Sequence, residues 1–317
     1  MTKETIRIGI SSCLLGEKVR FDGSHKLDRF LTETLGRYVE YVPVCPEVEL
    51  GLPTPRDTLR LAGTIDDTRL VFSKSGQDIT AEMTAWAQKR VEQLEKEELS
   101  GFIFKSKSPS SGMERVRLYD RNGVPQKRGI GLFARIFMEH FPLLPVEEDG
   151  RLHDPRLREN FIEIIFALRR WRTSLKQGKS ARHLVDFHTR HKLLLMAHSP
   201  DIYRQTGKLV ARSGELETTT LYTDYLALLM KGLRLRCTVA KHVNVLQHIF
   251  GYFKKQLSSD EKQEVLSIID SYRNHQLPLI VPITLLNHFV RKYQQKYLQK
   301  QVYLNPHPIE LKLRNHV

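Results

Sequence analysis

The most constraining feature of this sequence is a change of hydrophobic pattern near residue 155. Before this point, short apolar strands alternate with amphipathic helices, and after it only helical periodicity is found. Strands that alternate with helices pair in parallel through right-handed crossovers, whereas a continuous run of helices packs as a helical domain. The sequence therefore predicts an α/β domain with a parallel sheet over residues 1–147, followed by an all-α domain over residues 148–317.

The individual elements follow from the same periodicities. Strands are predicted at 6–10, 39–44, 70–72 and 102–104, and helices of the first half at 26–37, 79–98 and 131–140, with a short acidic connector over 142–150. Helices of the second half are predicted at 155–173, 180–197, 200–212, 217–232, 238–256, 259–274 and 282–300, several of them preceded by Ser or Asp residues suited to the N-cap.

Chemically distinctive residues follow three of the predicted strands. Cys13 comes directly after the first strand, the turn Cys45-Pro46-Glu47 after the second, and the Ser- and Lys-rich segment 106–112 after the strand at 102–104. Sites in open α/β sheets form outside the carboxyl ends of the strands. We therefore expect these three segments to converge at one edge of the sheet and to form the functional site.

Charge is distributed very unevenly between the two halves. Residues 1–150 hold 22 Lys and Arg against 23 Asp and Glu, whereas residues 151–317 hold 28 against 13. Such an asymmetry is typical of a domain that approaches a polyanion. A basic surface that only promotes solubility is the alternative.

The composition excludes several classes of protein. No run reaches the roughly 18 apolar residues of a membrane span, and three cysteines among 317 residues cannot form a disulfide framework. The N-terminus enters a strand pattern at once, without an apolar signal region. A cytoplasmic protein that does not contact the membrane is expected, and no protein partner is inferred.

The motifs of the first half resemble the thiouracil desulfidase family. They are ISSCLLG at 10–16, VRFDG at 19–23, CPE at 45–47 with GLPTPR at 51–56, and KSPSSG at 107–112. Residues 144–161 resemble the start of the helical domain found fused to it. The arrangement as a whole resembles bacterial enzymes that remove sulfur from 4-thiouridine in tRNA.

This resemblance implies a fold, a cofactor and site residues. The fold would be Rossmann-like, with a 4Fe–4S cluster held by three cysteines and one iron left open as a Lewis acid for sulfur. The ligands would be Cys13, Cys45 and the residue at position 111, where this chain has Ser111. Glu47 would act as acid and base, and Ser108 would hydrogen-bond near the substrate. Without the resemblance, two cysteines are more often structural.

Ser111 departs from the pattern of the family, which has a cysteine there. A serine oxygen is a harder and more basic ligand than a thiolate, so we expect the cluster to be weakened or absent and the activity of this chain to be impaired. Three explanations are open. The serine is an engineered Cys-to-Ser substitution, which the intact neighbouring motif favours; it is a natural variant; or Cys237 is recruited as the replacement ligand.

The candidate tRNA-binding residues are cations in two groups. One group near the expected site comprises Lys105, Lys107, Arg115 and Arg117, and the other, in the helical half, comprises Arg169, Arg170, Arg172, Lys176, Lys179, Arg182, Arg234 and Arg236. Lys and Arg neutralise phosphates without regard to sequence. Each residue taken alone is better explained as a solvated charge, so only their number argues for RNA.

Four histidines, His183, His188, His191 and His198, fall within one predicted helix and its end. No carboxylate or cysteine completes a plausible metal site with them, so phosphate contact or interhelical hydrogen bonding is the better interpretation. Two other functions stay open for the chain as a whole: a desulfidase of free thiouracil or thiouridine nucleotides, and a non-catalytic tRNA-binding protein.

Overall fold

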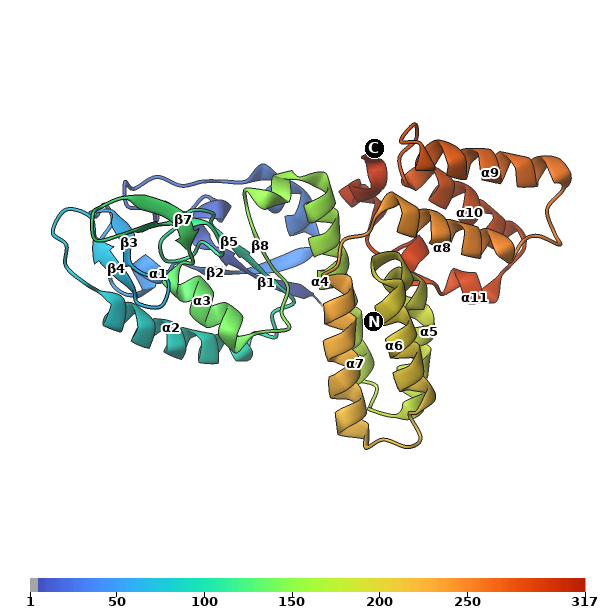
Figure 1. Cartoon of the computed structure of the whole chain (residues 1–317), viewed down its shortest axis with the longest axis horizontal. Coiled ribbons are helices and arrows are strands. Elements are labelled where there is room, and N and C mark those ends of the chain that lie inside the picture. Colours follow the sequence, from blue (N-terminus) through green and yellow to red (C-terminus); the bar gives the residue numbers. More distant parts are fainter. Residues whose placement is uncertain (1–4, 317) are drawn as a thin grey trace. The chain divides into compact units, whose positions relative to one another are not determined.

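The computed structural model describes residues 5–316 and divides the chain at Asp154–Pro155 into two compact units. The first unit carries the strands and the second is built from helices, as Figure 1 shows along the colour gradient from blue to red. The predicted fold class, a parallel-sheet α/β domain followed by an all-α domain, is confirmed. Among the described residues, none of the helices combines the length and hydrophobicity that a membrane span requires.

The main sheet of the first unit is entirely parallel. Its strands are β1 (Ile6–Ser11), β2 (Val39–Val44), β5 (Phe102–Phe104) and β8 (Val146–Glu148), in the spatial order β2-β1-β5-β8. The chain moves from β1 to one side for β2 and to the other side for β5. This reversal places the topological switch point between β1 and β5.

The segment predicted as an acidic connector contains β8, the fourth strand of this sheet. Glu147 and Glu148 are each only 6% exposed, because Arg151 pairs with Glu147 and the N–H of Met113 donates to Glu148. Two consecutive acidic residues give no apolar alternation, so the periodicity could not indicate a strand here.

A second sheet covers part of the first unit and was not predicted. It contains β3 (Leu59–Gly63), β4 (Thr68–Phe72), β6 (Val116–Tyr119) and β7 (Pro125–Gly129), in the order β4-β3-β6-β7. Only the β3–β6 pair is parallel. The strand predicted at 70–72 exists, but it belongs to this mixed sheet and not to the parallel one.

Helices α1 (Pro46–Glu49), α2 (Thr80–Glu95) and α3 (Leu132–His140) complete the unit. Aromatic rings join α3 to β5, with ring centroids 4.6 Å apart between Phe102 and Phe137. Such tilted aromatic pairs add to the hydrophobic stabilisation of a core.

The helix predicted over 26–37 forms only in its second part, and there as irregular turns. The backbone N–H groups of Lys26 and Asp28 donate to the carbonyls of Cys13 and Leu14, and the Asp28 carboxylate accepts from the N–H of Leu31. These bonds hold the segment beside the Cys13 loop, so helical turns form only at 30–34 and 35–37.

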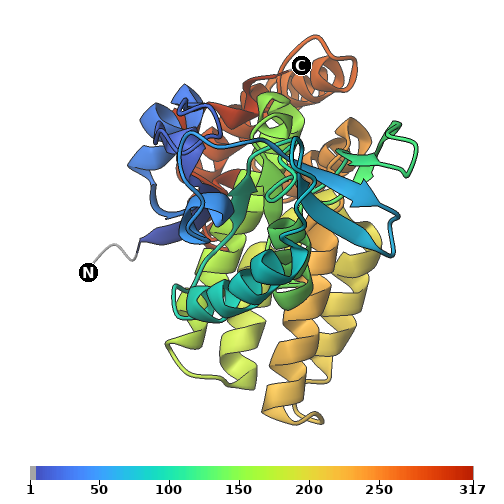
Figure 2. The same ribbon diagram turned by 90° about the vertical axis from the view of Figure 1, so that its left-hand side faces the viewer.

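The second unit consists of the predicted helices with small shifts of their ends. They are α4 (Pro155–Leu175), α5 (Ala181–His198), α6 (Pro200–Ala211), α7 (Thr218–Leu233), α8 (Val239–Gly251), α9 (Ser259–Arg273), α10 (Ile280–Lys292) and α11 (Lys296–Gln299). The helix predicted over 282–300 is divided at Gln294, whose φ is +48°. Helices α5, α6 and α7 pack side by side (Figures 1 and 2).

Candidate functional site

The segments after β1, β2 and β5 line one cavity of about 410 Å³, the site cavity. Cys13 lies in a short 3-10 turn after β1, Cys45 caps α1 after β2, and residues 105–112, the site loop, follow β5. The expected convergence of the three segments is confirmed. Because β1 and β5 flank the switch point, the site cavity occupies the crevice where α/β sheets bind ligands.

The site loop is held in place by the first turn of α3. The N–H groups of Gly131, Leu132 and Phe133 donate to the carbonyls of Gly112, Pro109 and Ser110, at 2.7, 3.1 and 2.9 Å. These are donors that a helix start would otherwise leave unpaired. A Cβ atom at Gly131 would lie 2.6 Å from the Ser110 carbonyl carbon, so only glycine allows this approach.

Cys13 and Cys45 bring two thiols to the site cavity, and both are free of disulfides. The pKa of each thiol is raised to about 11, mainly by burial; for Cys13 the charge of Lys105 opposes this rise and the nearby Cys45 adds to it. Without a cation, both thiols are therefore protonated at neutral pH. A bound metal ion would favour the thiolate forms that burial disfavours.

Glu47 ends a chain of hydroxyl groups from the site loop. Ser110 Oγ donates to Glu47 Oε1 at 2.7 Å, and Ser110 Oγ lies 3.0 Å from Ser108 Oγ. Because Ser110 has one hydroxyl proton, and the carboxylate takes it, Ser108 must donate to Ser110. Sequence reasoning named Glu47 and Ser108 but missed Ser110, which links them.

Arg56 fixes the other oxygen of Glu47. Its guanidinium is 2% exposed and donates to Glu47 Oε2 at 2.6 Å, and the same nitrogen donates to the carbonyl of Val19 at 3.0 Å. The carboxylate is 18% exposed. Glu47 is thus held at both oxygens while part of it stays open to the cavity.

Lys105 and Ser111 both line the site cavity, but only the Lys105 side chain has a partner among the described residues. The Lys105 ammonium pairs with Asp149 at 2.8 Å, whose other oxygen accepts from the Ser106 N–H at 2.7 Å. Burial alone would raise the pKa of Asp149, but the charge and hydrogen bonds of Lys105 and Ser106 hold it below its usual value. Ser111 is 3% exposed, and its hydroxyl makes no hydrogen bond to any described residue.

A second, larger cavity of about 920 Å³ adjoins the site cavity and is lined by cations. We call it the basic cavity; it contains Arg60, Lys107, Arg115, Arg117 and Lys127, and it shares Lys107 and Pro109 with the site cavity. Three of the predicted RNA-binding residues therefore line this adjoining cavity, and Lys107 also lines the site cavity with the cysteines. The fourth of that group, Lys105, has its charge engaged by Asp149.

The predicted cations of the helical unit differ in exposure. Lys176, Lys179, Arg182, Arg234 and Arg236 are exposed, whereas Arg169, Arg170 and Arg172 are half-buried. Arg170 donates to the carbonyl of Pro306 inside the unit. Its Nη1 is buried and has no hydrogen-bond partner among the described residues, so burial keeps this guanidinium from phosphate and Arg170 does not fit the predicted RNA surface.

Three of the four histidines noted in the sequence hydrogen-bond within the fold. His188 bonds the hydroxyl of Tyr225 between α5 and α7, and His183 and His191 contact backbone carbonyls of Gly178 and Phe187. The fourth, His198, contradicts the statement that no acidic or thiol group accompanies these histidines, because Glu163 and Cys237 lie against it.

Fold and cavity together define a Rossmann-like domain with a cysteine-lined site at its switch point, joined to a helical domain. Residues 8–149 match the 2-thiouracil desulfurase family, and residues 192–308 match a family of proteins of unknown function, DUF1722. The chain belongs to the 2-thiouracil desulfurase family through its first unit and carries a DUF1722 domain in its second.

Similar proteins are found in two model bacteria. The chain is 32% identical over 152 residues to the uncharacterized protein YbgA of Escherichia coli K12, which covers 48% of this chain and 90% of YbgA. It is 30% identical over 108 residues to the uncharacterized protein YbbK of Bacillus subtilis 168. This match covers 32% of this chain and 71% of YbbK. Among solved structures, the [4Fe-4S]-dependent thiouracil desulfidase TudS is 30% identical, with a TM-score of 0.39, covering 47% of this chain and 95% of TudS.

Proposed function

We propose that this protein removes sulfur from 4-thiouridine in tRNA, with water replacing sulfur to give uridine and hydrogen sulfide. The observation that carries the proposal is the composition of the site cavity. Two thiols, an unpaired hydroxyl and a carboxylate with a hydroxyl chain face one space, and a cation-lined cavity opens beside it. Membership of the 2-thiouracil desulfurase family supports the same chemistry.

The donor set of the site cavity fits an iron–sulfur cluster with one altered ligand. Cys13, Cys45 and Ser111 would hold it, since all three line the site cavity, and the hydroxyl of Ser111 would replace a third thiolate. A thiolate-bound iron with an open position supplies a soft Lewis acid for the leaving sulfur. Since oxygen is a harder ligand than sulfur, we expect the chain as given to hold the cluster weakly.

Glu47 is the residue suited to move protons in this reaction. Its two oxygens are positioned by Arg56 and Ser110, and its partial exposure lets it reach a water molecule in the site cavity. Taking a proton from water at the ring carbon and returning one to the leaving sulfur is general acid–base catalysis. Ser108, at the cavity end of the hydroxyl chain, can donate to the substrate once its bond to Ser110 is exchanged.

A tRNA substrate is supported by charge. A free base does not require a basic cavity beside the site or a helical unit with a large excess of Lys and Arg. Phosphates of a folded RNA bind such surfaces, and the target base must leave its stack to reach a recessed site.

The test of this substrate class uses the Ser111→Cys variant, reconstituted anaerobically with iron and sulfide. Bulk bacterial tRNA and a nucleoside digest of the same tRNA are supplied at equal 4-thiouridine concentration, and released sulfide is measured. We expect faster conversion of tRNA by at least about 10-fold. Equal conversion of the nucleosides would overturn the tRNA proposal in favour of a small substrate, and binding without sulfide release from either would leave a non-catalytic RNA-binding protein.

A further inference from the structure

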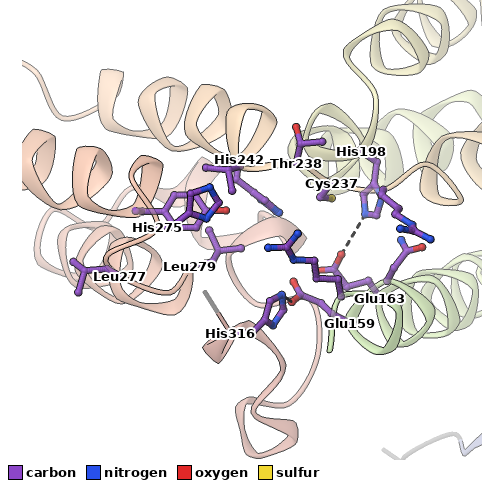
Figure 3. Close-up of a pocket in the computed structure, with 15 residues that line it drawn as sticks. Glu159, Glu163, His198, Cys237, Thr238, His242, His275, Leu277, Leu279 and His316 are labelled. Atoms are coloured by element: carbon purple, nitrogen blue, oxygen red, sulfur yellow. Dashed lines mark hydrogen bonds and ion pairs between the residues drawn. The ribbon is translucent and has the colours of Figure 1, made fainter. Parts of the chain in front are cut away.

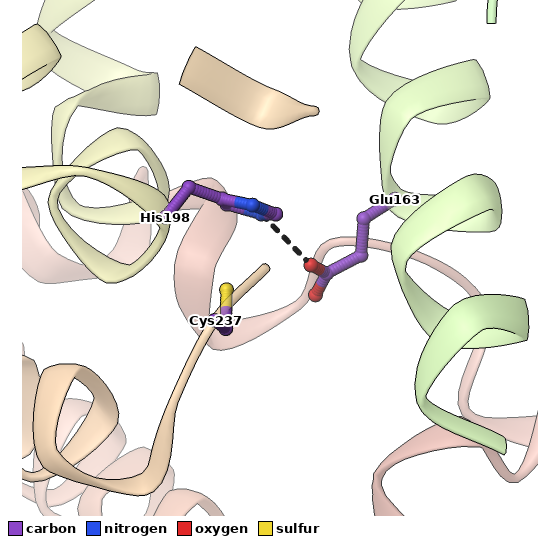
Figure 4. Close-up of side chains that lie close together, drawn as sticks. All are labelled: Glu163, His198 and Cys237. Atoms are coloured by element: carbon purple, nitrogen blue, oxygen red, sulfur yellow. Dashed lines mark hydrogen bonds and ion pairs between the residues drawn. The ribbon is translucent and has the colours of Figure 1, made fainter. Parts of the chain in front are cut away.

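The helical unit contains a buried group of metal-binding side chains that the proposed function does not use. Glu163 comes from the middle of α4, His198 is the last residue of α5, and Cys237 lies between α7 and α8. Their ligand atoms lie within 4.8 Å of one another, and Figure 4 shows the three side chains pointing toward one point. Glu163 is 1% exposed and His198 is fully buried.

The hydrogen bonds of His198 decide the state of its ring. Nδ1 lies 2.7 Å from the carbonyl of Leu235, which can only accept, so Nδ1 carries a proton. Nε2 lies 3.2 Å from Glu163 Oε2. In a neutral ring, the lone pair of Nε2 would face a lone pair of the ionised carboxylate. Either a second proton, on the ring or on the carboxylate, or a metal ion must therefore lie between Nε2 and Oε2. A histidine that donates its other N–H to a backbone carbonyl is the usual arrangement of a metal ligand.

The Glu163 carboxylate is also held in place by a neighbour. Glu163 Oε1 accepts from Arg314 Nη2 at 2.6 Å, and Arg314 also donates to the carbonyl of Tyr303 at 2.7 Å. Oε2 is thereby turned toward His198. Partners of this kind orient metal ligands and tune the metal.

A catalytic thiol triad is the competing interpretation of a Cys–His–Glu group. In such a triad, the two imidazole nitrogens serve different partners, one the nucleophile and the other the carboxylate. Here Nδ1 is bonded to the carbonyl of Leu235 and Nε2 faces Glu163, so neither nitrogen is left to take the proton of Cys237. Side chains that converge on one point can share a metal ion, but they cannot relay a proton in series.

The three ligand types and the space around them indicate the ion. One thiolate, one imidazole and one carboxylate form the borderline-soft set that Zn²⁺ prefers, and a tetrahedral zinc ion separates its ligand atoms by about 3.3–3.8 Å. The Nε2–Oε2 distance of 3.2 Å lies just below this spacing, and Cys237 lies in a partly exposed linker. A cavity of about 280 Å³, lined also by Thr238, His242 and His275, adjoins the group (Figure 3).

We propose that Glu163, His198 and Cys237 bind one divalent transition-metal ion, with Zn²⁺ the best match. The fourth position faces the adjoining cavity, where water or a small ligand binds. This site is independent of the cluster site in the first unit.

Cobalt is the probe for this site, because thiolate bound to Co²⁺ gives a charge-transfer band and tetrahedral Co²⁺ gives intense ligand-field bands. The untagged full-length chain carries Cys13→Ser and Cys45→Ser, so that Cys237 is its one thiol. After chelator treatment, Co²⁺ is titrated in and then displaced by Zn²⁺. We expect one equivalent of Co²⁺ with a thiolate band, and a rise of melting temperature with Zn²⁺.

The matched variant adds Cys237→Ser to the same background, with folding checked by circular dichroism. We expect loss of the thiolate band, a weakening of Co²⁺ binding by at least about 10-fold and no zinc-dependent rise in melting temperature. Cys237→Ala should behave alike if the serine variant folds poorly. A folded parent chain that binds no cobalt, or a cobalt spectrum unchanged in both variants, would overturn the proposal and leave His198–Glu163 as a buried ion pair.

Discussion

Ser110 provides the sharpest prediction for the chemistry of the site cavity. Ser110→Ala removes the 2.7 Å hydrogen bond to Glu47 and breaks the link to Ser108. Hydrogen bonds to charged groups contribute about 1.5–3 kcal/mol. If Glu47 needs this bond in the transition state, kcat/KM should fall by about 10- to 150-fold. The assay is 4-thiouridine loss from tRNA in the reconstituted Ser111→Cys background, at equal iron content.

Ser106→Ala is the matched control for this experiment. Ser106 belongs to the same loop and lines the same cavity, but its hydroxyl accepts from Lys105 and does not contact Glu47. We expect less than about a threefold change for this variant. A Ser110→Ala chain with full iron content and a rate within threefold of its parent would refute the role of the hydroxyl chain.

Three further predictions concern stability and binding. Asp149→Asn should lower the free energy of unfolding by about 1–3 kcal/mol at pH 7, because Lys105 loses its partner. Since the fold lowers the pKa of Asp149, urea denaturation should show the gap to the parent chain closing as the pH falls below about 4. Burial raises the pKa of Cys13 and Cys45 to about 11, so the unfolded chain loses these protons at a lower pH than the folded chain does. Urea denaturation of the metal-free chain should therefore show a free energy of unfolding that falls between about pH 9 and 11. This fall should be smaller in the variant with Cys13→Ser and Cys45→Ser. Arg117→Ala should weaken tRNA binding and reduce the slope of log affinity against log salt by about 0.7–0.9 in filter binding; an unchanged slope would remove Arg117 from the RNA surface.

The sequence predicted those parts of the fold that depend on local periodicity. Buried strands such as Phe102–Phe104 and amphipathic helices such as Thr80–Glu95 have strong patterns, and the order of parallel strands placed the three loops together. The mixed sheet was missed because its strands are short, so that Leu59–Gly63 and Val116–Tyr119 show only one or two apolar alternations, and Pro125–Gly129 is exposed except at its last residue. Its formation depends on pairing across the chain more than on local signals.

The same distinction applies to the two sites. Cys13, Cys45 and Glu47 could be named because each directly follows a strand, but the link through Ser110 depends on how the site loop turns against α3. Glu163, His198 and Cys237 come from three separate elements, with no spacing that relates them. Cys237 therefore read as an isolated cysteine, and only tertiary packing shows its partners.

A comparison of the chain with Ser111 and its Ser111→Cys variant tests whether this protein is a desulfidase of tRNA. Both are reconstituted anaerobically, their iron content is determined, and the loss of 4-thiouridine from bulk tRNA is followed together with sulfide release. The account predicts that the variant binds more iron and converts 4-thiouridine to uridine with one sulfide per base, while the chain as given is weak or inactive. A fully loaded variant that binds tRNA and releases no sulfide would contradict it.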